Sequence, residues 1–127
     1  MTKSPAPDSL IPLTAPVFHI LMALADRERH GYAIMQEVEV QTDGALRLGP
    51  GTLYGCIKRM LALGLLEPGG ERADPAIDDE RRRYYRLTDL GRRVARAEAD
   101  RMARAVAAAQ SKHLLSPRRA HLARGGP

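Results

Sequence analysis

The chain has 127 residues, with 20 Lys and Arg against 15 Asp and Glu, so its formal net charge at pH 7 is +5. This length suits one domain with an appended element, whose core must be aliphatic because aromatic residues make up only 4% of the chain. A single cysteine excludes an internal disulfide, and no apolar run reaches the ~20 residues of a membrane span. Since no signal-peptide pattern is visible, we expect a cytoplasmic protein, and the basic balance favours a phosphate-bearing partner.

Two helices are predicted in the first third of the chain. Residues 1–13 are rich in proline and are expected to form a flexible lead-in. Apolar residues then recur at helical spacing over 17–24, behind Thr14, which suits an N-cap. A second helix is predicted to open at His30 and to stop at the Thr-Asp-Gly of residues 42–44.

The third helix has the best-defined pattern. It follows Leu46-Arg47-Leu48, which alternates like a short extended segment. The helix is predicted to begin near Pro50, and Gly64 suits its C-terminal stop. Its apolar face, at 100° spacing, consists of Leu53, Ile57, Met60, Leu61 and Gly64.

Two short strands are predicted next, over 65–67 and 83–87. In the second strand, Tyr85 and Leu87 point to one side and Tyr84 to the other. The connection between the strands holds two Pro, two Gly and many charged residues, which is typical of a surface loop. Together these segments predict a hairpin with a long tip.

Thr88 suits the N-cap of a last helix, which is predicted to run to about Gln110. Small and apolar residues recur along it in a heptad-like seam. This seam comprises Leu90, Val94, Ala95, Ala99, Met102, Val106 and Ala109. The element order predicts a mainly α fold with a small antiparallel β-hairpin, that of a winged helix-turn-helix with an added C-terminal helix.

The third helix presents a small and basic face opposite its apolar one. Glycines near its start allow close approach to a partner, and its first backbone amides suit phosphate oxygens. Lysine and arginine further along can reach phosphates or guanine edges. The candidate DNA-binding residues on this helix are Pro50, Gly51, Thr52, Tyr54, Gly55, Lys58 and Arg59, and those on the hairpin are Arg81, Arg82, Arg83 and Tyr84. The competing interpretation is that the basic residues of this helix only form a solvent-exposed surface.

The tip of the hairpin is acidic. Five acidic residues stand against one arginine over residues 68–80, and phosphates would repel them. We therefore expect contact through the base of the hairpin, at Arg81–Arg83. The alternative is that these arginines form ion pairs with the neighbouring Asp78, Asp79 and Glu80.

Three segments in register resemble the PadR family of bacterial transcriptional regulators. They are HGYAIMQEVE at 30–39, LGPGTLYGCIKRMLALGLLE at 48–67 and RRRYYRLTDLGRR at 81–93. The resemblance covers roughly residues 17–95. It implies a winged helix-turn-helix repressor that binds a pseudo-palindromic operator as a homodimer, with the C-terminal helix in the dimer interface.

The resemblance also implies roles for individual residues. Thr52 and Tyr54 would anchor phosphates, while Lys58 would lie deeper in the groove. Tyr32 is expected either to pack in the core or to bond a phosphate. Some short family members stack drugs on a tryptophan of the C-terminal helix, and this chain has no Trp to support such a site.

The expected units are a lead-in at 1–13, a winged DNA-binding domain at 14–88, a dimerisation helix at 89–110 and a basic disordered tail at 111–127. No catalytic residues, metal site or cofactor are predicted, because no histidine pairs at helical spacing with another ligand. Cys56 is expected to be a buried inert thiol, with a redox switch as the alternative. A small-molecule effector has no sequence signature. The alternative to a DNA-binding regulator is a winged-helix adaptor whose basic face meets an acidic protein.

Overall fold

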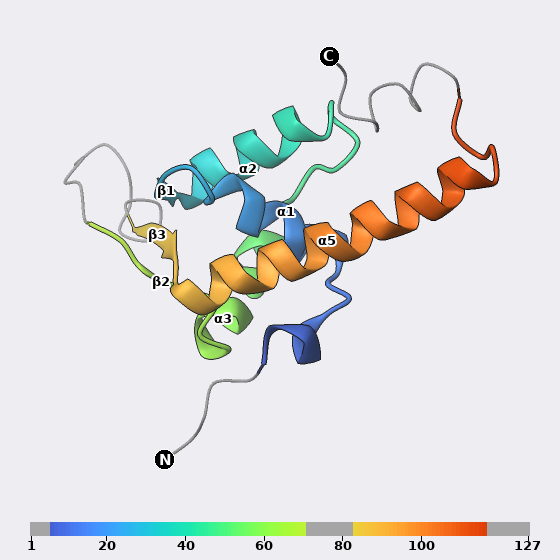
Figure 1. The fold of residues 1–127 in the computed structure, drawn as a ribbon. Coiled ribbons are helices and arrows are strands. Elements are labelled where there is room, and N and C mark those ends of the chain that lie inside the picture. The colour runs from blue at the N-terminus through green and yellow to red at the C-terminus, as the bar shows by residue number, and fades with distance from the viewer. Residues whose placement is uncertain (1–5, 71–82, 117–127) are drawn as a thin grey trace.

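A computed structural model describes residues 6–70 and 83–116 of the chain. Three helices, α1 (Ala15–Ala23), α2 (Gly31–Gln41) and α3 (Pro50–Ala62), pack on one another beside a small sheet. A long helix, α5 (Asp89–Ser111), crosses this body, and its C-terminal half extends beyond it (Figure 1). The mainly helical winged helix-turn-helix prediction is confirmed.

The sheet has three antiparallel strands in the order β1–β3–β2. The hairpin of β2 (Leu66–Pro68) and β3 (Tyr84–Leu87) matches the prediction, and its pairing of Glu67 with Arg86 carries an ion pair at 2.9 Å. The edge strand β1 (Arg29–His30) was not predicted, because two residues are too short for an alternating pattern. The alternating segment 46–48 is no strand; its Leu48 side chain is buried in the core instead.

Side chains cap three of the helices. Thr14 Oγ1 accepts a hydrogen bond from Val17 N (3.4 Å), and His30 Nδ1 accepts one from Ala33 N (3.1 Å). Thr88 Oγ1 accepts one from Gly91 N (2.9 Å). These bonds satisfy amides that the helices themselves leave unpaired, so the chain enters each helix in a defined direction.

The core is aliphatic, as the composition predicted. Its fully buried side chains include Ile20, Leu21, Ile34, Val38, Leu53, Met60, Leu65 and Val94. Two corrections follow. Leu90 and Val94 lie in this core, so they join α5 to its own winged domain and cannot belong to an exposed dimer seam. Tyr32 is 51% exposed, so it does not pack in the core.

The lead-in prediction is wrong for residues 7–13. Pro7–Leu10 form a 3-10 helix, η1, that contacts α5, and the side chain of Leu13 packs against the core. The backbone amide of Leu13 donates to Oε2 of Glu98 at 2.6 Å, and Glu98 is fully buried. A buried carboxylate on α5 therefore holds the N-terminal segment in place. Residues 1–5 and most of the predicted tail, 117–127, lie outside the described residues.

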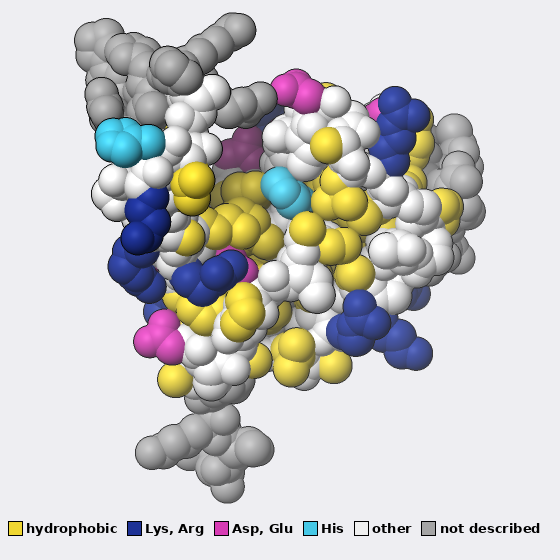
Figure 2. Space-filling model, turned by 90° about the vertical axis from the view of Figure 1, so that its right-hand side faces the viewer, with side chains coloured by type: hydrophobic (Ala, Val, Ile, Leu, Met, Phe, Trp, Pro, Cys, Tyr) yellow, Lys and Arg dark blue, Asp and Glu magenta, His cyan; other side chains and the backbone are white. Residues whose placement is uncertain are grey.

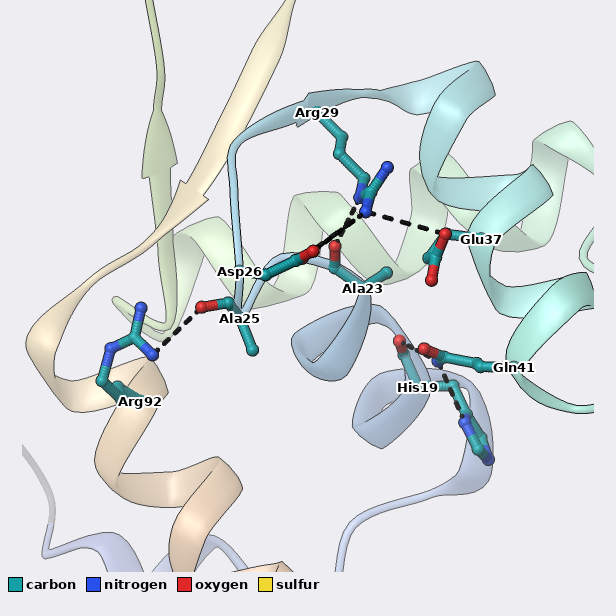
Figure 3. A network of polar contacts seen from close by, with 8 residues as sticks. All are labelled: His19, Ala23, Ala25, Asp26, Arg29, Glu37, Gln41 and Arg92. Atoms are coloured by element: carbon teal, nitrogen blue, oxygen red, sulfur yellow. Dashed lines mark hydrogen bonds and ion pairs between the residues drawn. The ribbon is translucent and has the colours of Figure 1, made fainter.

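A polar network joins α1 to α2 and to α5 (Figure 3). Arg29 Nε donates to the carbonyl of Ala23 at 2.7 Å, and its guanidinium forms an ion pair with Glu37 at 3.6 Å. Gln41 Nε2 donates to the carbonyl of His19 at 2.8 Å, and burial lowers the pKa of that histidine. Arg92 reaches back from α5 to the carbonyl of Ala25 (3.2 Å). Carbonyls of α1 and of the segment after it thus receive hydrogen bonds from β1, α2 and α5.

Candidate nucleic-acid interface

Helix α3 divides into a buried face and an exposed face. Leu53, Cys56, Ile57 and Met60 are buried, as the spacing predicted for three of them. The exposed face carries Gly51, Thr52, Lys58, Arg59 and Ala62. It is therefore small near the start of the helix and basic in its middle.

The start of α3 differs from those of α1, α2 and α5. Its N-cap is Gly49, which makes no side-chain hydrogen bond, and Pro50 occupies the first turn. The first backbone bond of the helix runs from Leu53 N to the carbonyl of Gly49 at 2.9 Å. The amides of Gly51 and Thr52 precede this bond. Because both residues are exposed, these amides are available to an anion such as a phosphate.

Two glycines of α3, the exposed Gly51 and the half-buried Gly55, have no packing neighbour that requires glycine. A Cβ atom added to Gly51 or Gly55 would meet no atom within 4 Å. Gly31 differs, because an added Cβ there would lie 2.8 Å from Cζ of Tyr54. Tyr54 is half-buried and its ring covers the start of α2 at Gly31. Its packing role was missed by the sequence analysis, which assigned it only to phosphate.

Lys58 and Arg59 are both exposed, and as successive helical residues they point in directions about 100° apart. Lys58 forms no ion pair with any of the described residues. The guanidinium of Arg59 lies 3.5 Å from Sγ of Cys56, a weak acceptor. Both cations are therefore exposed, and neither is paired with a carboxylate among the described residues.

The base of the hairpin lies beside the C-terminal half of α3. A hollow there is lined by Leu61 of α3 and by Arg83 and Tyr84 of the hairpin, among others. Arg83 is exposed, whereas the Tyr84 ring packs edge-on against His30 with centroids 5.3 Å apart. Arg81, Arg82 and the acidic tip fall within 71–82 and lie outside the described residues, so neither the predicted contact nor the alternative ion pairs are tested.

The remaining seam residues lie between Ala95 and Ala109 of α5. Ala95 is half-buried against the chain's own core, and Met102 is half-buried. Val106 is 39% exposed. Ala99 and Ala109 complete the set. Figure 2, viewed toward the end from which α5 extends, shows hydrophobic side chains spread over this face of the molecule.

The described residues give little support to a redox-active thiol or a metal site. Cys56 is buried, and its Sγ lies 3.5 Å from the guanidinium of Arg59. Within residues 6–70 and 83–116, no group of three or more His, Cys, Asp or Glu side chains is placed to hold a metal ion.

None of the helices in the described ranges combines the length and apolar character that crossing a bilayer requires.

The model of the PadR-like family of transcriptional regulators matches residues 20–97, which include the end of α1, all of α2 and α3, and the strands of the hairpin. The chain belongs to this family. PadR family regulators are DNA-binding, non-enzymatic transcription factors. In this chain, α3 occupies the position of the second helix of a helix-turn-helix, and its exposed face is the one described above.

Two curated relatives match different shares of their own length. The chain is 36% identical over 96 residues to the transcriptional regulator Rv3488 of Mycobacterium tuberculosis, covering 73% of this chain and 83% of the relative. It is 44% identical over 85 residues to an uncharacterized 37.1 kDa protein in transposon TN4556 of Streptomyces fradiae, covering 67% of this chain. The chain spans only 22% of the length of that second relative.

A solved structure has the same fold. A PadR family transcription regulator from Clostridium difficile R20291 superposes with a TM-score of 0.60 at 22% identity. The match covers 80% of this chain and all of the other. At this identity the likeness concerns the fold alone.

Proposed function

We propose that the chain is a sequence-specific repressor of transcription that binds a pseudo-palindromic operator as a homodimer. The observation that carries the proposal is the exposed face of α3. It combines a helix start without a side-chain cap, two glycines whose added Cβ atoms would meet nothing within 4 Å, and two cations that have no acidic partner among the described residues.

On this proposal, α3 enters the major groove. The amides of Gly51 and Thr52 bind a phosphate, and Gly55 allows the helix axis to approach the base edges. Lys58 reaches a base edge or an inner phosphate, and Arg83 contacts the sugar-phosphate backbone from the base of the hairpin. The four contacts come from elements that the shared core holds rigidly together.

The dimer is proposed to form through the outer part of α5. This part extends beyond the winged body, and its apolar positions Met102 and Val106 remain partly exposed there (Figure 1). A second copy would cover them by helix-to-helix packing, for which the alanines of α5 allow close approach. A two-fold dimer presents two α3 helices, which accounts for an operator with two related half-sites.

The proposal is tested by selection of bound DNA from a random pool, followed by fluorescence anisotropy on the selected site. We expect enrichment of a two-fold sequence and specific binding that resists competitor DNA. Affinity should fall steeply with salt, because Lys and Arg displace condensed counterions from DNA. If no sequence is enriched and the basic face instead captures an acidic protein, the adaptor alternative holds.

A further inference from the structure

We propose that Glu28 is a positioning residue for DNA binding, because its carboxylate anchors the hairpin where the chain leaves the sheet and so fixes the base of the hairpin relative to α3. Glu28 directly precedes β1. Its Oε1 accepts a hydrogen bond from the backbone amide of Gly70 at 3.2 Å. The contact therefore joins the segment that leads into α2 to the strand that leads out of the sheet.

The anchor acts where the regular pairing of the hairpin ends. The register of β2 with β3 runs from Leu66 to Pro68, and the amide of Gly69 still donates to the carbonyl of Tyr84 at 2.7 Å. Gly70 is the next residue, and its amide donates to Glu28 instead. Glu28 is half-buried, whereas Gly70 is exposed. The carboxylate thus holds the first residue beyond the strand pairing.

Gly69 makes room for this carboxylate. A Cβ atom added at Gly69 would lie 2.9 Å from Oε2 of Glu28 and 3.1 Å from its Cδ, closer than a Cβ atom packs. The Cβ of Tyr84 is the next neighbour, at 3.3 Å. The backbone of Gly69 does not have the positive φ that favours glycine. The absence of a side chain at Gly69 is therefore explained by the close approach of Glu28.

The segment that carries Glu28 is also joined to both helices of the helix-turn-helix. The ring of His30 caps α2 and packs edge-on against Tyr84 of β3. Gly31 lies against the ring of Tyr54 in α3. Four successive residues, 28–31, therefore contact the hairpin, α2 and α3. A hairpin that is fixed to Glu28 is fixed relative to α3 as well.

The consequence for DNA rests on the proposed function. Gly69 and Arg83 line one hollow together with Leu61 of α3, so the anchored glycine lies at the base of the hairpin, where Arg83 is proposed to meet the DNA backbone. Without the anchor, the hairpin base would have to be ordered on binding, which costs affinity. A carboxylate near phosphates also opposes binding by its charge. Removal of the charge and removal of the anchor should therefore have opposite effects.

The anchor is tested on the full chain with two variants, Glu28→Gln and Glu28→Ala. Both remove the charge, but only glutamine keeps an oxygen that accepts from Gly70. Amide hydrogen exchange of Gly70, followed by NMR on ¹⁵N-labelled protein, should be about three- to tenfold faster in Glu28→Ala than in Glu28→Gln. The amide of Thr88, which donates to the carbonyl of Leu65 at 3.1 Å, is the control and should not change. Equal exchange of Gly70 in the two variants would overturn the anchor.

A double-mutant cycle tests the role of Gly69. Gly69→Ala should displace the carboxylate and speed the exchange of Gly70 by a similar factor in the wild-type chain. In the Glu28→Ala background, the same substitution should have little further effect. Melting temperatures of the single and double variants verify that each chain folds. Independent effects in the cycle would mean that Gly69 is required by Tyr84 and not by Glu28.

DNA affinity then separates positioning from a role in folding alone. On the selected site, Glu28→Gln should bind at least as tightly as the wild-type chain, because it loses a negative charge and keeps the anchor. Arg83→Gln should weaken binding at least about threefold more in the Glu28→Gln background than in the Glu28→Ala background. If Glu28 serves only folding, the melting temperature falls in Glu28→Ala while Arg83→Gln has the same effect in both backgrounds.

The two proposals fail in different ways. If Gly70 exchanges faster in Glu28→Ala than in Glu28→Gln but the wild-type chain binds no DNA, the proposed function fails and Glu28 remains an anchor of the hairpin only. If DNA binds and the effect of Arg83→Gln is the same in both backgrounds, the positioning role fails alone.

Discussion

At the scale of single residues, glycines near the starts of α2 and α3 have different surroundings. Gly31 faces the ring of Tyr54, whereas Gly51 and Gly55 face open space. The first is explained by packing inside the chain. For the other two, no atom lies within 4 Å of an added Cβ, and the proposed DNA contact would account for them. Substitutions should therefore separate folding from DNA binding.

Gly55→Ala should raise the free energy of unfolding by up to about 1 kcal/mol, because alanine is the better helix former and its Cβ meets nothing. Gly55→Leu should also fold but lose DNA affinity, since its side chain fills the space that the groove requires. Thermal unfolding and anisotropy check the two parts. Full DNA affinity in Gly55→Leu would remove Gly55 from the interface.

Gly31→Ala should lower the free energy of unfolding by about 1–3 kcal/mol, because the new methyl group overpacks against Tyr54. Gly51→Ala, with nothing near its Cβ, is the control and should not destabilise. Denaturant unfolding of both variants gives the comparison. An equal effect at the two positions would mean that helix-start geometry, and not the Tyr54 ring, requires glycine at 31.

Lys58→Ala should cost about 1–3 kcal/mol of DNA-binding free energy if the side chain reads a base edge, and less if it meets only phosphate. Arg96→Ala, which removes an exposed cation from α5, controls for net charge. Anisotropy on the selected site and on scrambled DNA distinguishes the cases. Equal loss on both DNAs would exclude base reading by Lys58.

At the scale of elements, α5 is both a wall of the winged domain and an extension from it. Gly91 lets the helix lie against the start of β2, because an added Cβ would be 3.0 Å from the carbonyl carbon of Leu65. One turn beyond Val94, Glu98 turns its buried carboxylate to the amide of Leu13 and to Arg101. The first half of α5 is thus integrated into the fold, which is why its apolar residues serve the core.

The pH dependence of stability should report on Glu98. Its hydrogen bond with Arg101 lowers the pKa of the carboxyl, opposed by burial and aided by the Leu13 amide. A lowered folded-state pKa contributes stability above the ordinary glutamate pKa, and that stability is lost as pH falls through the lowered value. Glu98→Gln should therefore lower the melting temperature at neutral pH, with the difference from wild type shrinking in acid.

Melting temperatures of both proteins across the acid range check this dependence. Burial also lowers the pKa of His19, so the wild-type chain loses stability from that group in acid as well. Because Glu98→Gln retains His19, the difference between the two curves isolates Glu98. A difference that stays constant with pH would show that the carboxylate charge contributes nothing.

At the scale of the whole molecule, the outer part of α5 determines how two copies would be arranged. Met102→Asp should place a charge in the proposed seam and shift sedimentation from dimer to monomer, since an unpaired buried charge is strongly unfavourable. Ala107→Asp puts the same charge on an exposed position away from the seam and should leave the dimer intact. A dimer that survives Met102→Asp would place the interface elsewhere.

Much of the fold was predictable, because its signals are local. The apolar period and Gly-Pro start of α3, the Thr88 cap of α5 and the hairpin each occupy a few turns or one strand. The basic face of α3 followed from the same period. The seam prediction is wrong at Leu90 and Val94, because a heptad pattern does not reveal which half of a helix its own domain will cover. The outer part of the seam stays a prediction.

The sequence by itself determined the helix order, the winged helix-turn-helix class and the face of α3 that remains exposed, since periodicity within one element encodes them. Only the tertiary structure decided that Tyr54 covers Gly31, that Leu90 and Val94 are core residues, and that Leu13 is bonded to Glu98. That last pair is separated by 85 residues. Such contacts depend on how distant segments pack together, and no local pattern in the chain records them.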